Sequence, residues 1–181
     1  MKLKSILEDI EILKPRRSSE ERQKNYTVVL QKQIQQYIKN GCEGDLDLRD
    51  APIEKLPENL KKVGGNLILS RSKIKTLPND LHVDKCLSLE STEIKKLPNN
   101  LTVDGSVWAC DSKIEELGKN TKISNHLDLS YSAIKKIPED IEIGTDDRYY
   151  YLYLGGTPIS YSCSIADLRR TLPNIKSKIF F

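Results

Sequence analysis

Apolar residues recur along most of the chain with a period of about twenty residues. Six segments largely share the pattern L-x-L-x-x-[ST]-x-I-x-x-L-P. Their isoleucines are 21, 20, 20, 20 and 25 residues apart, at Ile53, Ile74, Ile94, Ile114, Ile134 and Ile159. A fixed period in this range is typical of a solenoid, in which each unit buries its apolar residues only by stacking on its neighbours.

Each unit divides into a strand, a turn and a return segment. The L-x-L motif, as in Leu67-Ile68-Leu69, alternates between inward and outward positions and therefore predicts a short strand. One strand per unit, stacked in parallel, gives a continuous parallel sheet. The Leu-Pro step that follows, as in Leu77-Pro78, disfavours a long helix and favours an extended or tight helical return. A second apolar pair in each return, such as Leu81 and Val83, should face the same interior.

This pattern resembles the leucine-rich-repeat family, in particular the short class with twenty residues and a Leu-Pro step per unit that occurs in bacterial secreted effectors and small bacteriophage proteins. The resemblance covers roughly two thirds of the chain. It implies an α/β solenoid with a parallel, concave sheet of about six short strands. The sequence departs from the family where an Asn usually follows the strand; the residues here are Ala51, Ser72, Thr92, Ser112, Ser132 and Thr157. Hydroxyl groups can bond to the turn backbone as that Asn does, so we expect a Ser/Thr ladder that is interrupted at Ala51.

We expect one structural domain with three parts: an N-terminal helical cap (1–41), the repeats (42–160) and a C-terminal helix-strand cap (161–181). Apolar positions at helical spacing predict helices over 3–13 and from Ser18 to about 39. Ser164 and Asp167 predict the start of a helix over 165–171. The alternation in 174–181 predicts a final strand in which Ile175, Ile179 and either Phe181 or Phe180 cover the last unit. Two alternatives remain: the first helix could act in secretion or membrane binding, and the tail could dock on a partner.

Composition narrows the function classes. The net charge of +3 and pI near 8.5 are too mild to imply nucleic-acid or membrane binding. The four cysteines form no C-x-x-C pair, so we expect reduced thiols rather than a zinc site or disulfide framework. Long apolar runs are absent from the sequence, and acidic residues such as Glu8 interrupt the N-terminal segment, which argues against a signal peptide. These features predict a cytoplasmic protein, acting in the host cytoplasm if phage-encoded.

The candidate partner-binding surface is the outward face of the predicted sheet. Trp108, the sole tryptophan, occupies the middle outward position of the fourth unit. Aromatic side chains on such a face are typical hot spots of protein interfaces. The predicted binding residues are Trp108, Tyr131, Tyr153, Asp128, His126, Arg71, Ile68 and Tyr151. In the alternative strand phase, Val107 and Ala109 point outward and Trp108 is buried.

Catalysis finds little support in the sequence. Cys86 and His126 could form a nucleophilic dyad, but they lie two units apart, or about 10 Å at the usual strand spacing, which exceeds hydrogen-bond reach. Effectors with these repeats often carry an appended ubiquitin-ligase domain, whereas only about 20 residues follow the repeats here. We expect no catalytic residues, no cofactor and no metal site.

Three hypotheses follow. The first is a non-enzymatic protein-binding module, a phage or bacterial effector that binds and inhibits or sequesters a host protein through its concave face. The second is a structural subunit of a larger assembly such as a virion. The third is a nucleic-acid-binding protein, although acidic residues such as Glu54 and Glu115 interrupt the rows of lysines. The sequence does not fix the partner, the oligomeric state or the curvature.

Overall fold

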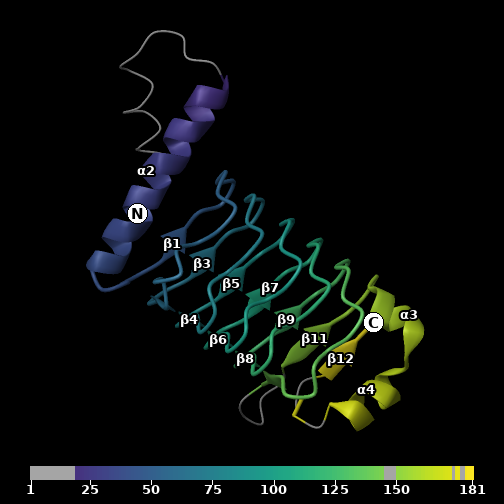
Figure 1. The fold of residues 1–181 in the computed structure, drawn as a ribbon. Coiled ribbons are helices and arrows are strands. Elements are labelled where there is room, and N and C mark those ends of the chain that lie inside the picture. Colours follow the sequence, from purple (N-terminus) through teal and green to yellow (C-terminus); the bar gives the residue numbers. More distant parts are fainter. Residues whose placement is uncertain (1–18, 145–149, 173, 176–177) are drawn as a thin grey trace.

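The chain forms a β-solenoid of about five turns with parallel sheets (Figure 1). The structure is a computed structural model, and it describes residues 19–144, 150–172, 174–175 and 178–181. The predicted solenoid architecture is thereby confirmed. None of the helices in these described ranges is long and apolar enough to span a bilayer.

The larger sheet has seven parallel strands, one more than the repeat pattern predicts. Its order is β1 (Leu46–Asp47), β3 (Leu67–Ile68), β5 (Leu87–Ser88), β7 (Val107–Trp108), β9 (Leu127–Asp128), β11 (Tyr151–Tyr153) and β12 (Lys178–Phe180). The first six lie in the six predicted segments. The seventh comes from the C-terminal tail, where the sequence predicts a final strand.

The return segments form a second parallel sheet of five strands, which the sequence did not predict. These strands are β2 (Lys62–Val63), β4 (His82–Val83), β6 (Thr102–Val103), β8 (Lys122–Ile123) and β10 (Glu142–Ile143). The returns are therefore extended rather than helical. The prolines lie before these strands, where their missing N–H costs no sheet hydrogen bond.

The core fills the space between the two sheets. In β3 and the residue after it, Leu67 and Leu69 are fully buried while Ile68 is half-buried, as the predicted alternation requires. The isoleucines that define the period are all buried, as are the predicted return pairs such as Leu81 and Val83. Each fully buried Leu or Ile contributes about 1.5–3 kcal/mol. Stacking of the units is thus the main source of stability.

The hydroxyl ladder is confirmed only in part. Thr92 and Ser112 each donate a hydrogen bond of 2.7 Å to a carbonyl three residues earlier, and Thr157 does the same toward Leu154. These bonds close the turn of one unit and do not link neighbouring units. The equivalent hydroxyls of Ser72 and Ser132 are buried and have no hydrogen-bond partner among the described residues.

Helix α2 (Ser19–Lys39) lies beside β1 at one end of the solenoid (Figure 1). Leu30 and Ile34 of this helix are buried in the core, and the Tyr37 hydroxyl donates to the Cys42 and Gly44 carbonyls. Gly41, at a φ of +86°, turns the chain after the helix, in agreement with the predicted stop. The predicted helix over 3–13 lies outside the described residues.

Two short helices precede β12 at the other end. Helix α4 (Ile165–Thr171) has the predicted bounds, and Ser164 and Asp167 form a capping box at its start. Helix α3 (Pro158–Ser162) was not predicted; Thr157 caps it, and Pro158 occupies its first turn. Ile175 and Ile179 are buried as predicted, whereas Phe180 and Phe181 each remain 42% exposed.

Candidate functional site

The strand phase that the sequence favours is confirmed at Trp108. Val107 and Ala109 are fully buried, and Trp108 is half-buried on the opposite face of the strand. The indole therefore lies on the outer face of the seven-stranded sheet and not in the core between the sheets.

Five rings make a continuous strip across this outer face, from β7 to β12. The Trp108 and His126 ring centroids are 6.1 Å apart, and His126 stacks on Tyr151 at 5.0 Å. Tyr151 contacts Tyr153 at 5.8 Å, and Tyr153 stacks on Phe180 at 5.4 Å. We call these residues the aromatic strip: Trp108, His126, Tyr151, Tyr153 and Phe180.

Phe180 is a member of the strip that sequence reasoning missed. The sequence predicted only that Phe180 or Phe181 would cover the last unit. In the structure, β12 pairs with β11 so that Phe180 lies opposite Tyr153. Phe180 therefore extends the outward column that contains Trp108 and Asp128. The alternation of the tail was the available signal, but its register against β11 was not fixed by the repeat period.

His126 also has a structural role that the sequence did not reveal. A ladder of side-chain acceptors runs along the start of the strands, and each member accepts the backbone N–H of the equivalent residue in the next unit. Asp45 accepts from Asn66 at 2.7 Å, and His126 Nδ1 accepts from Tyr151 at 3.1 Å. The members are Asp45, Asn66, Cys86, Ser106 and His126. The ladder orients the His126 ring between Trp108 and Tyr151.

Asp128 lies between two rings of the strip. On neighbouring strands it pairs in register with Trp108 on one side and Tyr153 on the other. Its Oδ1 accepts a hydrogen bond of 2.9 Å from the Ser130 N–H. Among the described residues, no ion pair to Asp128 is present. The structure thus brings together five of the predicted binding residues, namely Trp108, His126, Asp128, Tyr151 and Tyr153.

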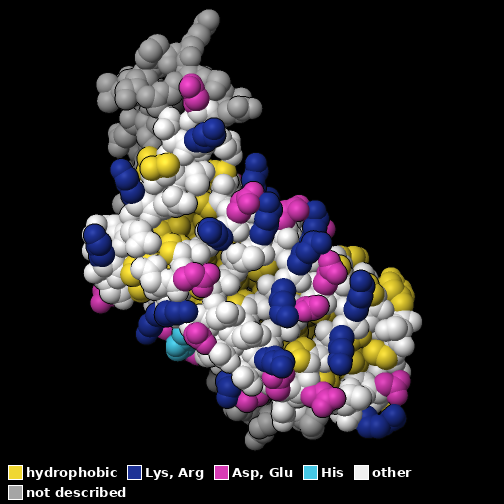
Figure 2. Space-filling model, in the orientation of Figure 1, with side chains coloured by type: hydrophobic (Ala, Val, Ile, Leu, Met, Phe, Trp, Pro, Cys, Tyr) yellow, Lys and Arg dark blue, Asp and Glu magenta, His cyan; other side chains and the backbone are white. Residues whose placement is uncertain are grey.

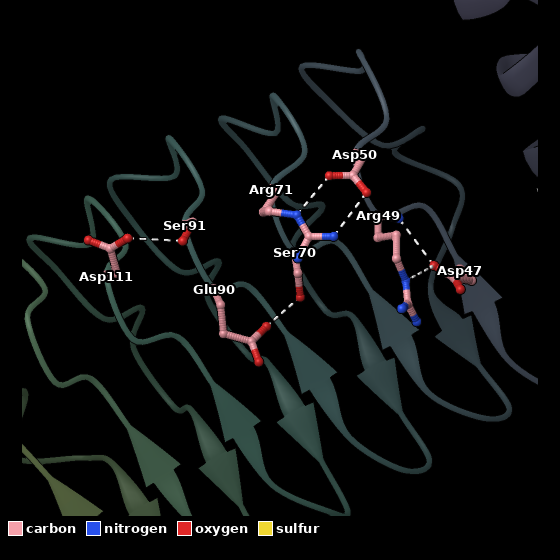
Figure 3. Close-up of polar contacts among 8 residues, drawn as sticks. All are labelled: Asp47, Arg49, Asp50, Ser70, Arg71, Glu90, Ser91 and Asp111. Carbon is pink, nitrogen blue, oxygen red and sulfur yellow. Dashed lines mark hydrogen bonds and ion pairs between the residues drawn. The ribbon is translucent and has the colours of Figure 1, made fainter.

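Arg71 and Ile68 are not brought to the strip. Arg71 lies on the turn after β3 and makes two hydrogen bonds to Asp50, at 2.8 and 3.0 Å (Figure 3). Ile68 lies opposite Ser88, which separates it from Trp108 by one strand. On this side of the strip, polar side chains link neighbouring units: Ser70 donates to Glu90, and Ser91 donates to Asp111 (Figure 3).

Tyr131 lies on the turn after β9 and is 73% exposed. Its φ is +59°, and Asp50, Arg71, Ser91 and Asp111 share this left-handed backbone at the same position in their own units. The Tyr131 ring lies against Gly156, the next member of that column: a Cβ at Gly156 would be 2.5 Å from the ring. The predicted binding residue therefore projects from the rim rather than from the sheet.

The Cys110 thiol shows little of the character that a catalytic nucleophile needs. Burial raises the pKa of Cys110, and the nearby carboxylates of Asp128, Glu90 and Asp111 raise it further, which disfavours the thiolate. Cys86 and His126 lie near β5 and β9, with β7 between them, as the sequence predicted. The four cysteines are all free thiols.

His82, Asp84 and Asp104 come together on the five-stranded sheet, a grouping that was not predicted. Their ligand atoms lie within 4.8 Å of one another. Asp104 accepts a hydrogen bond of 2.9 Å from His82 Nε2, and Lys62 pairs with Asp84 at 2.9 Å. Because these contacts already engage the carboxylates, we interpret the group as surface ion pairing. The twenty-residue offset between Asp84 and Asp104 was the signal that could have found it.

The predicted rows of lysines are interspersed with carboxylates (Figure 2). Lys75 pairs with Glu54 at 2.8 Å and Lys113 with Glu93 at 2.7 Å, in each case between neighbouring units. Lys96 and Glu116 form a similar pair at 2.9 Å. Pairing of this kind reduces the positive potential that nucleic-acid binding requires.

No protein-family model matches this chain, and a search of curated proteins found no match.

Proposed function

We propose that this chain is a non-enzymatic protein-binding module that holds one partner through the aromatic strip. One observation carries the proposal: five rings in continuous contact lie on the outer face of a parallel sheet, and the strip includes Trp108, Tyr153 and Phe180. Large rings that are already packed together lose little conformational freedom when a partner covers them. Aromatic residues near the centre of an interface commonly dominate its energy.

The family and biological context remain part of this proposal. The twenty-residue period and the Leu-Pro steps support membership of the short leucine-rich-repeat class, with the strip on its concave face. Small stand-alone repeats of this class resemble phage or bacterial effectors. We therefore infer a role in which the protein binds and inhibits or sequesters a host protein in the cytoplasm. The raised pKa of Cys110 and the separation of Cys86 from His126 support a non-enzymatic role.

Affinity capture from host extract, followed by binding measurements with the captured protein, tests the proposal. We expect Trp108→Ala and Tyr153→Ala each to weaken binding by about 2 kcal/mol or more, with little loss of thermal stability, because both side chains point away from the core. Asp47→Ala, at the far end of the same outward column, is the matched control and should bind as the wild type does. Unchanged binding by both aromatic variants, or an equal loss with Asp47→Ala, would reject the aromatic strip as the binding surface.

A second candidate function, a subunit of a larger assembly, rests on the C-terminal end of the solenoid. Tyr161 is 83% exposed there, and Ile165 and Phe181 are also exposed. In Figure 2, hydrophobic side chains gather at the end of the molecule that carries α3 and the C-terminus. Light scattering on the purified chain discriminates the two functions: an assembly subunit self-associates, and Tyr161→Ser should then reduce the association. A monodisperse monomer would favour the binding module.

A further inference from the structure

The outward column places one carboxylate between two rings of the strip. Asp128 lies between Trp108 and Tyr153 in the outward column, with one strand step to each side. Two strand steps amount to about 9.6 Å between the two aromatic positions. A planar group stacked between two rings needs about 7 Å, so the strand spacing is wide enough for one such group above the carboxylate.

The acidic groups on this face have different kinds of partner. Asp47 pairs with Arg49 and Asp50 with Arg71, while Glu90 accepts from Ser70 (Figure 3). Asp128 uses Oδ1 for the Ser130 N–H, and the described residues supply no cation to it. Among the described residues, it is therefore the carboxylate beside the rings of the strip that has no cation as its partner.

The potential around this carboxylate is negative. Besides burial, three carboxylates raise the pKa of the nearby Cys110 thiol, with Asp128 the strongest, followed by Glu90 and Asp111. The neighbouring turn column contains one cation, Arg71, and Asp50 of the same column already engages it. A cation is thus the complementary charge for this part of the face.

Resting on the proposed function, we infer that the partner's anchor is an arginine side chain whose guanidinium stacks between Trp108 and Tyr153 and pairs with Asp128. Arginine fits better than lysine for two reasons. Its planar group stacks on aromatic faces, and its fork of N–H donors matches a carboxylate, whereas an ammonium group is compact and more strongly hydrated. The partner is therefore a protein segment that presents an exposed arginine to the strip.

Because Trp108 is the sole tryptophan, its fluorescence reports directly on this site. The probe is the peptide acetyl-Gly-Arg-Gly-amide at millimolar concentrations, at constant ionic strength, with the neutral citrulline peptide as its control. We expect a saturable change in Trp108 emission with the arginine peptide, and a response at least about tenfold weaker with citrulline and with Asp128→Asn. Asp111→Asn, a neighbouring carboxylate that Ser91 engages, should respond as the wild type does. Equal responses to arginine and citrulline, an unchanged response in Asp128→Asn, or no saturable response would each overturn the inference.

The captured partner separates this inference from the proposed function. If Trp108→Ala abolishes capture while Asp128→Asn binds with unchanged affinity, the binding module stands and the arginine anchor is rejected. If Asp128→Asn weakens capture about tenfold and replacing one arginine of the partner by glutamine has the same effect, with no further loss when both changes are combined, the anchor is supported. Unchanged capture by Trp108→Ala rejects the proposed function itself.

Discussion

The backbone N–H of Tyr151 donates a hydrogen bond of 3.1 Å to Nδ1 of His126, and the two rings stack with centroids 5.0 Å apart. A nitrogen that accepts this bond carries no proton, so the neutral His126 ring has its proton on Nε2. The same side chain thereby ends the acceptor ladder and supports the middle of the aromatic strip. His126 therefore contributes both to the backbone hydrogen bonding of the fold and to the candidate binding surface.

The first prediction concerns the loss of this acceptor. His126→Ala should lower the free energy of unfolding by about 1–3 kcal/mol, because the Tyr151 N–H loses its partner and the strip loses a stacked ring. Urea unfolding measures the change. His126→Asn should retain much of the stability, since Asn66 accepts the equivalent N–H three units earlier in the ladder.

His82 supplies the control for this prediction. It is the other histidine of the chain, it lies on the five-stranded sheet, and its side chain is 41% exposed. His82→Ala should cost about 1 kcal/mol or less, because it removes a surface hydrogen bond to Asp104. If both variants lose a similar free energy of unfolding, the hydrogen bond from Tyr151 to His126 contributes no more to stability than a surface hydrogen bond does.

The second prediction concerns acid pH and Asp45, the first acceptor of the ladder. The backbone N–H of Asn66 is the main reason that the pKa of Asp45 lies below its ordinary value of 3.8. A carboxyl group whose pKa is lower in the folded state stabilises the fold above its unfolded pKa, and this stabilisation is lost as the pH falls through the folded pKa. We expect the wild type to be more stable than Asp45→Asn at pH 7, with the difference shrinking below about pH 4. Urea unfolding of both proteins across this range checks it, and a constant difference would contradict the prediction.

The third prediction tests the register of β12. Ile179 is 6% exposed and its neighbour Phe180 is 42% exposed, so a shift of one residue would exchange their environments. Ile179→Ala should cost about 2–4 kcal/mol of stability, whereas Phe180→Ala should cost about 1 kcal/mol or less and weaken partner binding. Thermal unfolding and partner binding of the two variants distinguish the registers. The reverse order of stability losses would mean that Phe180 faces the core and does not belong to the strip.

Most of the fold could be predicted from the twenty-residue period, because each unit must place a Leu or Ile at the same inward position for the units to stack. The sequence therefore placed β3, β5 and β7 and the phase of Trp108 correctly. The second sheet was missed because its strands are two residues long and their apolar content is a single Val or Ile beside a polar residue, as in Lys62–Val63. Pattern alone cannot separate such a segment from a tight helical return.

The candidate site was predictable only where it follows the repeat. Trp108, Asp128 and Tyr153 share one column, and their alignment follows from the period apart from the insertion before β11. Phe180 comes from outside the repeats, so its place depended on how the tail pairs. The role of His126 could not be predicted because the four acceptors before it in the ladder are chemically different: a carboxylate, an amide, a thiol and a hydroxyl. No single residue type marks that column.

The fourth prediction separates fold from binding at Tyr131. Its left-handed backbone, with a φ of +59°, costs about 1–2 kcal/mol for a residue with a Cβ, while glycine adopts it freely at some entropic cost in the unfolded chain. Tyr131→Gly should therefore raise the free energy of unfolding by up to about 1 kcal/mol, although it removes a large exposed ring. Tyr131→Ala keeps the strain and serves as the control. If Tyr131 also contacts the partner, both variants bind more weakly, and a glycine variant less stable than the alanine variant would contradict this account.

The fifth prediction compares two serines at the same position of neighbouring units. Ser112 donates a hydrogen bond of 2.7 Å to the Ala109 carbonyl, whereas the buried hydroxyl of Ser132 has no partner among the described residues. Ser112→Ala should cost about 0.5–1.5 kcal/mol, because it removes a buried bond. Ser132→Ala should be neutral or stabilising, since it removes an unsatisfied polar group, and the first unit already has Ala51 at this position. Urea unfolding of both variants gives the comparison with the same chemical change in the same local fold. Equal losses would mean that the Ser132 hydroxyl closes its own turn in solution as the Ser112 hydroxyl does.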